Sequence, residues 1–560
     1  MEPLRLYLLA GLVFHKLVWE LLKRRQPAQT RAPFPPVKAV KIAALAALLA
    51  QALLPPVLPL SPHPGFTPIL GALLFTASLA VAVTARLQLG RNWSDVESAA
   101  VLPGQRLVAQ GVYSRLRHPI YTADVLLVAG YQLALNSWLV LLAVPLAAWV
   151  WRKAAAEERL LAAQLKGYAA YLKTSARFVP RHAAVGLAAL ALAFSAQLYL
   201  VSTQYNGNWT GLFYNSARAG LPPALANEPL YRPPNRLGYD GQFYHYIAHD
   251  PFLLRGFQQF IDAPRLRYPR ILLPALAWLL ALGQDPLIHP ALLAAALIPF
   301  FFGPLWLAAL AERFHRGRWW GLAFLLIPAA LISIERLTVD AWLLALAAGI
   351  VFYSLNDRPW PRFALLALAP LARETGVLFI AACGLWLLLE RRWRTAFLTA
   401  AAALPALAWT LYVRAHTPTF FSHLAPPASG SALLDRLRIF FPYPHLPRWI
   451  ETIAISLDYV SLAAVLLALA LAFWSLRRKP ADTAHLTAAA FAALPLILGG
   501  VIGWYEPFGH TRTLSPLYLM LLISALRSGS RLYLAPLALL LPRIALEMAP
   551  LLPGVRGLMR

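Results

Sequence analysis

Residues 121–151 decide the fold class of this chain, and they read YTADVLLVAGYQLALNSWLVLLAVPLAAWVW. Two apolar runs, Tyr121–Leu135 and Trp138–Trp151, lie on either side of the polar pair Asn136 and Ser137. Long apolar runs of this kind favour helices that lie in a lipid bilayer. The stretch therefore predicts a helical hairpin that enters a membrane and returns to the side from which it came.

The composition of the whole chain agrees with this interpretation. Of its 560 residues, 59% are hydrophobic and 13% are charged, whereas soluble domains average about 45–50% apolar and about 25% charged residues. The same numbers exclude disorder. The net charge of +26 is typical of the Lys-rich and Arg-rich cytoplasmic loops of membrane proteins, and no soluble basic domain or nucleic-acid motif accompanies it. We therefore predict an all-α, polytopic membrane protein without a nucleic-acid partner.

The positions of the basic clusters predict a division of the chain near residue 182. Residues 1–181 should form five spans whose polar residues face the cytoplasm. Residues 182–560 should form ten to twelve spans whose polar residues face outward. A large loop at residues 202–267 should lie on that outer side. The Ala-rich, Leu-rich and Arg-rich composition favours the inner membrane of a bacterium.

Three further segments have patterns that depart from simple spans. Residues 154–172 are too polar to cross a bilayer and repeat apolar side chains at helical spacing, so we expect them to lie along the cytoplasmic face. Ile271–Leu282 is short and is expected to be re-entrant. Phe363–Leu389 is expected to form two half-length helices that meet at Arg373 and Glu374.

Polar residues gather at both ends of the first hairpin. Arg117, His118 and Tyr121 precede it, and Glu157 and Glu158 follow it. Because a hairpin brings its two ends to one surface, basic and aromatic side chains should face two carboxylates there. That set suits a zwitterionic small molecule. The residues alone leave open a second interpretation, in which the basic residues anchor the chain at the interface and the glutamates begin a solvated helix turn.

The motifs in this part, Arg-His-Pro-x-Tyr at 117–121, Glu-Glu one hairpin later and a Gly-x-x-Tyr…Arg-Phe-x-Pro tail at 167–180, resemble the isoprenylcysteine carboxyl methyltransferase family. Relatives of that family include membrane phospholipid methyltransferases. The resemblance implies an all-helical S-adenosylmethionine site at the cytoplasmic interface and an apolar acceptor that enters from the lipid. The cofactor-binding residues that it implies are Arg117, His118, Pro119, Tyr121, and Glu157 or Glu158.

The outer loop of the second part carries Asp240 within Tyr-Asp-Gly-Gln-Phe, and an Arg373-Glu374 pair interrupts a later apolar run. We expect Asp240 to be partly desolvated next to Gly241, which would raise its pKa toward the range of a general base. Two plainer interpretations remain open. In the first, Asp240 is a structural residue of a turn. In the second, Arg373 and Glu374 form an ion pair with each other at a helix break.

Histidines of the second part are not expected to bind a metal. His249, His416 and His510 show no paired spacing of the kind that metal ligands have in a sequence. The lone cysteine, Cys383, lies in an apolar run and excludes a disulfide framework.

An acidic residue in a long first loop, followed by many spans with Arg-rich turns, resembles the polytopic C-type glycosyltransferases. The resemblance implies a polyprenyl-phosphate sugar donor at the outer face and a lipid or glycan acceptor. Asp240 would be the catalytic base with Asp250 as its substitute, and Arg270 or Arg373, the latter beside Glu374, would offset charge on the departing phosphate. A divalent metal at Asp240 and Asp250 is left open.

Together these patterns predict a bifunctional membrane enzyme, a cytoplasm-facing methyltransferase fused to an outward-facing glycosyltransferase. Two other interpretations remain. One is a methyltransferase that carries a non-catalytic membrane module. The other is a lipid transporter or flippase, which would need ionisable residues near the middle of its spans and repeated halves.

Overall fold

The computed structural model confirms the all-α prediction, because its described residues form α-helices and 3-10 helices, with β-contacts only as isolated bridges. The described residues are 3–24, 36–55, 57–60, 67–93, 104–218, 220–233, 238–418, 433, 436, 442–444, 446–477, 482–497 and 507–551.

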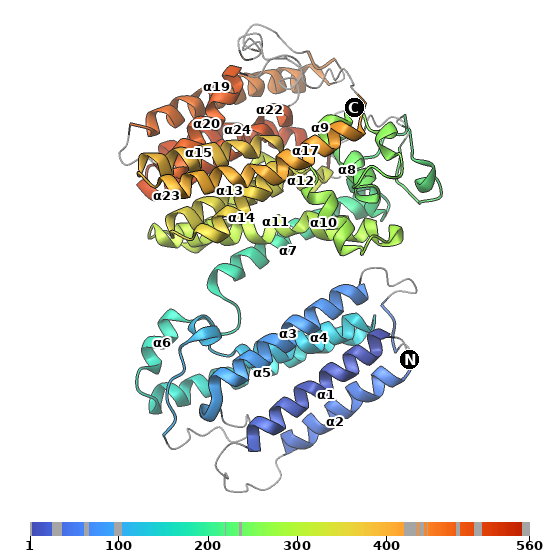
Figure 1. Ribbon diagram of the computed structural model, residues 1–560, viewed down its shortest axis with the longest axis vertical. Coiled ribbons are helices and arrows are strands. Elements are labelled where there is room, and N and C mark those ends of the chain that lie inside the picture. Colours follow the sequence, from blue (N-terminus) through green and yellow to red (C-terminus); the bar gives the residue numbers. More distant parts are fainter. Residues whose placement is uncertain are drawn as a thin grey trace. The chain divides into compact units, whose positions relative to one another are not determined.

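The chain forms two compact units, Met1–Arg181 and His182–Arg560 (Figure 1). The boundary falls where the predicted topology changes its polar side. The assignment of a separate enzyme to each unit, and of each unit to a side of the membrane, stays a prediction.

The first unit is a bundle of neighbouring helices (Figure 1). A turn at Leu135 and Asn136, followed by extended Ser137, joins α4 to η3 and α5, as the hairpin prediction requires. The predicted separation of a span ending at Trp151 from a surface helix starting at Ala154 is wrong, because α5 continues past both residues to Gln164. The helix predicted over residues 154–172 is instead interrupted after Gln164, and α6 follows from Tyr168. The elements are α1 Pro3–Arg24, α2 Pro36–Leu53, α3 Thr67–Leu89, η1 Gly90–Asn92, η2 Gly111–Ser114, α4 Pro119–Ala134, η3 Trp138–Leu142, α5 Ala143–Gln164 and α6 Tyr168–Thr174.

Two glycines let α3 and α4 approach closely. A Cβ atom added to Gly71 would lie 2.1 Å from the backbone nitrogen of Ala134, and one added to Gly130 would lie 2.5 Å from the backbone nitrogen of Phe75. Small residues at helix contacts are the usual means of close packing inside a membrane, where burial of apolar surface gives little driving force between helices. This contact fixes the direction of α4, whose first turn carries the Arg-His-Pro-x-Tyr motif.

The second unit is built around α11 and α13, which pack against each other and are largely buried. The predicted break in Phe363–Leu389 is confirmed, because α14 ends at Ala372 and α15 begins at Val377. The elements are α7 Arg181–Gln204, η4 Trp209–Phe213, η5 Pro223–Leu225, α8 Asp240–His249, η6 Phe257–Phe260, α9 Pro264–Arg267, α10 Leu272–Leu280, α11 Asp285–Arg313, η7 Arg318–Leu326, α12 Pro328–Arg336, α13 Asp340–Leu355, α14 Pro359–Ala372, η8 Glu374–Gly376, α15 Val377–Leu389, α16 Trp393–Ala400, η9 Ala401–Ala403, α17 Leu404–His416, α19 Arg448–Ser475, α20 Thr483–Ile497, α22 Pro507–Thr513, α23 Ser515–Ser528, η10 Arg531–Leu534, α24 Ala535–Met548 and η11 Ala549–Leu551.

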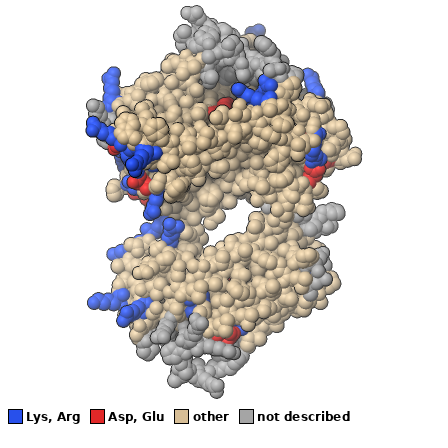
Figure 2. Space-filling view, in the orientation of Figure 1, with Lys and Arg blue, Asp and Glu red and all other residues tan. Residues whose placement is uncertain are grey.

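Apolar surface covers much of both units. Figure 2 shows broad uncharged areas on each unit, with Lys and Arg gathered at their margins. Among the described residues, six helices are long and apolar enough to cross a membrane, or up to seven if the bent pair η7 and α12 is one span. The predicted numbers of spans, five and ten to twelve, are therefore not confirmed. The six helices are Thr67–Leu89, Trp138–Gln164, Arg181–Gln204, Asp285–Arg313, Trp393–His416 and Arg448–Ser475.

Candidate functional sites

In the first unit, the backbone joins the segment before α4 to the segment after α6. The backbone nitrogen of Arg117 donates to the carbonyl of Ala176 at 2.8 Å, and that of His118 donates to the carbonyl of Arg177 at 3.2 Å. The backbone nitrogen of Ala176 donates in turn to the carbonyl of Arg115 at 2.9 Å. The Arg-His-Pro motif and the Arg-Phe tail motif, distant in sequence, thus form one short parallel pairing.

Glu158 is the buried centre of this arrangement. Its carboxylate accepts from Arg117 Nε at 2.8 Å and from Arg177 Nη2 at 2.6 Å, and His118 Nε2 lies 3.3 Å from it. The side chain is only 8% exposed. Hydrogen bonds to the Glu158 carboxylate favour the charged guanidinium and raise the pKa of Arg177. Charge-assisted and partly bidentate contacts of this kind are strong and directional, so Glu158 holds the motifs in register.

Glu157 has a different environment. Its side chain is 37% exposed, accepts a hydrogen bond from the Tyr121 hydroxyl at 2.9 Å and lies 3.7 Å from His118 Nδ1. The rings of His118 and Tyr121 stack with their centroids 5.3 Å apart. One accessible carboxylate therefore lies beside two flat rings, while the neighbouring carboxylate is fully engaged in structural contacts.

The structure thus brings together five of the six residues predicted for cofactor binding, and the sixth, Pro119, is the first residue of α4, where its missing N–H costs nothing. Arg177, Phe178 and Trp151 complete the cluster and were not predicted as site residues. The Arg177 guanidinium lies 4.7 Å from the ring centre of Trp151, and Phe178 lies 5.9 Å from His118, centre to centre. The tail motif contained the signal for the first two.

Comparison with known proteins agrees with the prediction of a methyltransferase in the first unit. The model of the phospholipid methyltransferase family matches residues 66–166, a segment that contains both the Arg-His-Pro-x-Tyr motif and the Glu-Glu pair. The match supports a membrane methyltransferase, and together with the apolar helices it fits a multi-pass membrane protein. No curated protein and no solved structure matches the chain.

In the second unit, Asp240 is the buried first residue of α8. Its carboxylate lies 2.7 Å from Arg267 Nη1 and accepts from Arg512 Nη1 at 3.0 Å. Burial raises the pKa of Asp240, but the positive charges of Arg512, Arg267 and Arg270 outweigh burial and hold that pKa well below its usual range. The expected rise in pKa is therefore wrong. Arg267 and Arg270 come from the segment that follows α8, whereas Arg512 is 272 residues away and its approach could not be foreseen.

Arg373 and Glu374 do not satisfy each other. Glu374 accepts two hydrogen bonds from Arg270, each of 2.8 Å, whereas Arg373 Nε lies 3.9 Å from it. Arg373 instead donates to buried Asp340 and, at 2.9 Å, to the hydroxyl of Thr513. The interpretation of a self-contained pair is wrong. Two ion pairs replace it, one of Glu374 with Arg270 and one of Arg373 with Asp340, and Asp340 also lies 3.8 Å from the Arg512 that contacts Asp240.

Asp250 lies at the other end of α8 and has a local role. Its carboxylate accepts from the backbone nitrogens of Leu254 at 2.8 Å and Arg255 at 3.0 Å, which fixes the turn after the helix. At about 1.5 Å per residue, the ten residues from Asp240 to Asp250 span about 15 Å. One metal ion cannot bind both carboxylates, and the suggested site at Asp240 and Asp250 is excluded.

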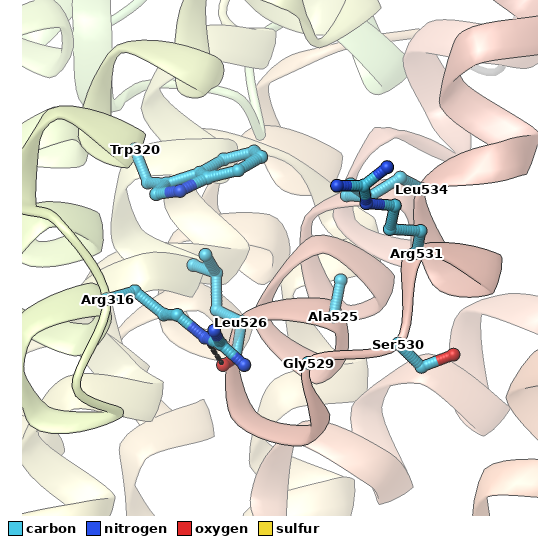
Figure 3. A pocket seen from close by; sticks show the side chains of 8 residues that line it. All are labelled: Arg316, Trp320, Ala525, Leu526, Gly529, Ser530, Arg531 and Leu534. Atoms are coloured by element: carbon cyan, nitrogen blue, oxygen red, sulfur yellow. Dashed lines mark hydrogen bonds between the residues drawn. The ribbon is translucent and has the colours of Figure 1, made fainter.

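A pocket of about 190 Å³ lies elsewhere in the second unit, between the start of η7 and the ends of α23 and η10 (Figure 3). Arg316 borders it and donates through Nε to the carbonyl of Leu526 at 3.2 Å, close to the end of α23. This arginine therefore satisfies a helix C-terminus. The pocket is lined by Arg316, Trp320, Ala525, Leu526, Gly529, Ser530, Arg531 and Leu534, and it holds none of the predicted site residues.

Proposed function

We propose that the first unit transfers a methyl group from S-adenosylmethionine to a membrane lipid at the cytoplasmic face. The observation that carries the proposal is the pairing of Tyr121 with accessible Glu157, both inside the segment that matches the phospholipid methyltransferase family. The apolar surface around α3 to α5 supports an acceptor that reaches the site from the lipid.

The side chains of the site are chemically suited to this cofactor. S-adenosylmethionine supplies a methyl group that its sulfonium already activates, and it also carries an ammonium group and ribose hydroxyls. Glu157 would hold the ammonium group or the ribose, and the faces of His118 and Tyr121 suit a neighbouring cation. Pro119 sets the first turn of α4 beneath them.

The remaining residues of the cluster position these groups. Glu158 joins Arg117 and Arg177 and so keeps both motifs in place. Because the methyl group is already activated, the protein must mainly align donor and acceptor and exclude water, and such positioning can supply about 7–11 kcal/mol of the barrier at best.

Replacing Glu157 by Gln should weaken binding of S-adenosylmethionine by at least about tenfold, since one charge-assisted contact contributes about 1.5–3 kcal/mol. Calorimetry on the full-length protein in detergent measures this affinity. Glu20→Gln is the matched control, because Glu20 is half exposed and pairs with Lys16 on α1 at 2.7 Å. Equal affinity in Glu157→Gln and the wild type would remove Glu157 from the site.

As a second function, we propose that the second unit transfers a sugar from a polyprenyl-phosphate donor. The observation that favours it is the contact of buried Asp240 with Arg267 at 2.7 Å and with Arg512 at 3.0 Å, close to the ion pair of Arg270 and Glu374. Guanidinium groups suit phosphate oxygens. A donor phosphate that engaged Arg267 or Arg512 would loosen their grip on the Asp240 carboxylate, whose pKa would then rise toward that of a base.

Replacing Asp240 by Asn should lower glycosyl transfer by about 10²–10⁴-fold, the usual contribution of a general base, and should leave methyl transfer intact. Transfer of radiolabelled sugar from a polyprenyl-phosphate donor in membranes measures the first activity. Asp357→Asn is the control, since Asp357 is 64% exposed and pairs with Arg392. Unchanged sugar transfer in Asp240→Asn would contradict the assignment.

A further inference from the structure

Three histidines and one glutamate of the second unit converge on a single point. Glu228, His245, His249 and His289 each offer one ligand atom, and the four atoms lie within 4.8 Å of one another. His245 and His249 lie one turn apart on α8, His289 is in the first turns of α11, and Glu228 follows η5. Side chains from three separate segments of the chain thus place their ligand atoms close to one another.

The distances between these atoms suit a bound ion. The Nε2 atoms of His245 and His249 are 3.1 Å apart, Glu228 Oε2 is 2.7 Å from His289 Nε2, and it is 3.9 Å from His245 Nε2. Ligands at about 2.0–2.2 Å from a tetrahedral Zn²⁺ lie about 3.3–3.6 Å from one another. Small adjustments therefore convert the present spacing into a coordination shell.

Two of the histidine rings lie in the interior of the unit and not at its surface. The side chains of His245 and His249 are both fully buried. Phe213 stacks on His245 with its ring centre 4.7 Å away, so the ring orientation is fixed by packing.

A carboxylate contacts the second ring nitrogen of His249. His249 Nδ1 lies 2.8 Å from Asp285 Oδ1, and Asp285 also accepts from Arg255 at 2.7 Å and 2.8 Å. A proton on Nδ1 that is shared with Asp285 leaves Nε2 deprotonated and facing the other ligands. Ligand histidines of metal sites commonly have this arrangement of carboxylate, imidazole and metal.

We propose that Glu228, His245, His249 and His289 bind one Zn²⁺ ion. Imidazole nitrogens with one carboxylate suit zinc, and four protein ligands form the closed shell that is typical of a structural site. The ion would join α8 to the start of α11 and to the loop before α8. Since Asp240 is the first residue of α8, the same ion would also fix the helix that positions it.

The expectation that His249 lacks a paired spacing is wrong, because His245 and His249 are four residues apart on one helix face. The other two ligands come from residues 228 and 289, and only the fold brings them to the pair. The four-residue spacing of His245 and His249 was therefore the only part of this site visible in the sequence.

Metal analysis of the full-length protein in detergent tests the proposal. After dialysis against a chelator and reloading with ZnCl2, the wild type should retain about one Zn²⁺ per chain, and the His245→Ala/His249→Ala double variant should retain none. His416→Ala is the matched control, since His416 is exposed on α17, and it should retain the ion. A wild type that retains no zinc, or a double variant that retains as much as the wild type, overturns the proposal.

Asp285→Asn gives a second measurement that does not remove a ligand. Loss of the supporting carboxylate should weaken zinc affinity by about 10–100-fold while the stoichiometry at saturation stays the same. CoCl2 provides a spectroscopic probe, because a tetrahedral N3O site should give strong visible absorption in the wild type. Unchanged affinity in Asp285→Asn together with octahedral-type, weak cobalt absorption would contradict the proposed coordination.

Discussion

Replacement of Glu158 by Ala should destabilise the first unit by about 3–5 kcal/mol, the usual cost of removing one partner from a buried ion pair. Arg117 and Arg177 would then face each other without the carboxylate that separates them. We expect the pairing between the Arg-His-Pro and Arg-Phe motifs to open and methyl transfer to be lost. Thermal unfolding of the full-length protein, read from near-ultraviolet circular dichroism, measures the change.

Glu20→Gln supplies the comparison, because the pair of Glu20 with Lys16 lies on an exposed face and exposed pairs contribute about 0–1 kcal/mol. Glu158→Gln shows how much of the loss is due to the charge of Glu158 and how much to its size. The amide has a similar size and retains one acceptor oxygen, but it cannot neutralise two guanidinium groups. A Glu158→Ala protein that melts with the wild type would show that the cluster is not what joins the two motifs.

Replacement of Arg373 by Met should destabilise the second unit by a similar amount, about 3–5 kcal/mol. Asp340, the first residue of α13, is almost fully buried and would lose its closest cation, with Arg512 remaining 3.8 Å away. α13 packs in the core between α11 and α14, so its displacement should spread through the unit. Chemical unfolding in mild detergent, followed by tryptophan fluorescence, measures the effect.

The double variant Arg373→Met/Asp340→Leu tests the reason for that loss. Replacing both partners of a buried pair by apolar residues is often neutral or stabilising, so the double variant should recover most of the stability that Arg373→Met loses. Arg392→Met is the surface control, because its partner Asp357 is 64% exposed. If the double variant is less stable than Arg373→Met, a buried Asp340 charge without its partner is not the cause of the stability that Arg373→Met loses.

The sequence predicted the features that depend on neighbouring residues. The apolar pattern on both sides of Asn136 predicted the first hairpin, and Arg373 predicted the helix break after α14. The two ends of the hairpin predicted that His118 and Tyr121 would meet Glu157. Each of these follows from helix periodicity or from the geometry of a single connection.

Contacts between distant segments could not be predicted in the same way. Arg177 reaches Glu158 because the tail after α6 pairs with the segment before α4, and Arg512 reaches Asp240 across 272 residues. A sequence gives charge and spacing but not which arginine will approach which carboxylate. The wrong direction for the pKa of Asp240 and the wrong partner for Arg373 have this origin. The histidine cluster has it only in part, since His245 and His249 are neighbours on α8 and only Glu228 and His289 are brought in by the fold.

The most direct test of the central claim is transfer of label from S-adenosylmethionine, labelled in its methyl group, to lipids of membranes that contain the full-length protein. The proposed function predicts labelled lipid with the wild type and Glu20→Gln. It predicts at least about tenfold less with Glu157→Gln at limiting cofactor concentration, if the loss follows one charge-assisted contact. Unlabelled lipids with the wild type, or equal labelling by Glu157→Gln, would contradict a methyltransferase site at Tyr121 and Glu157.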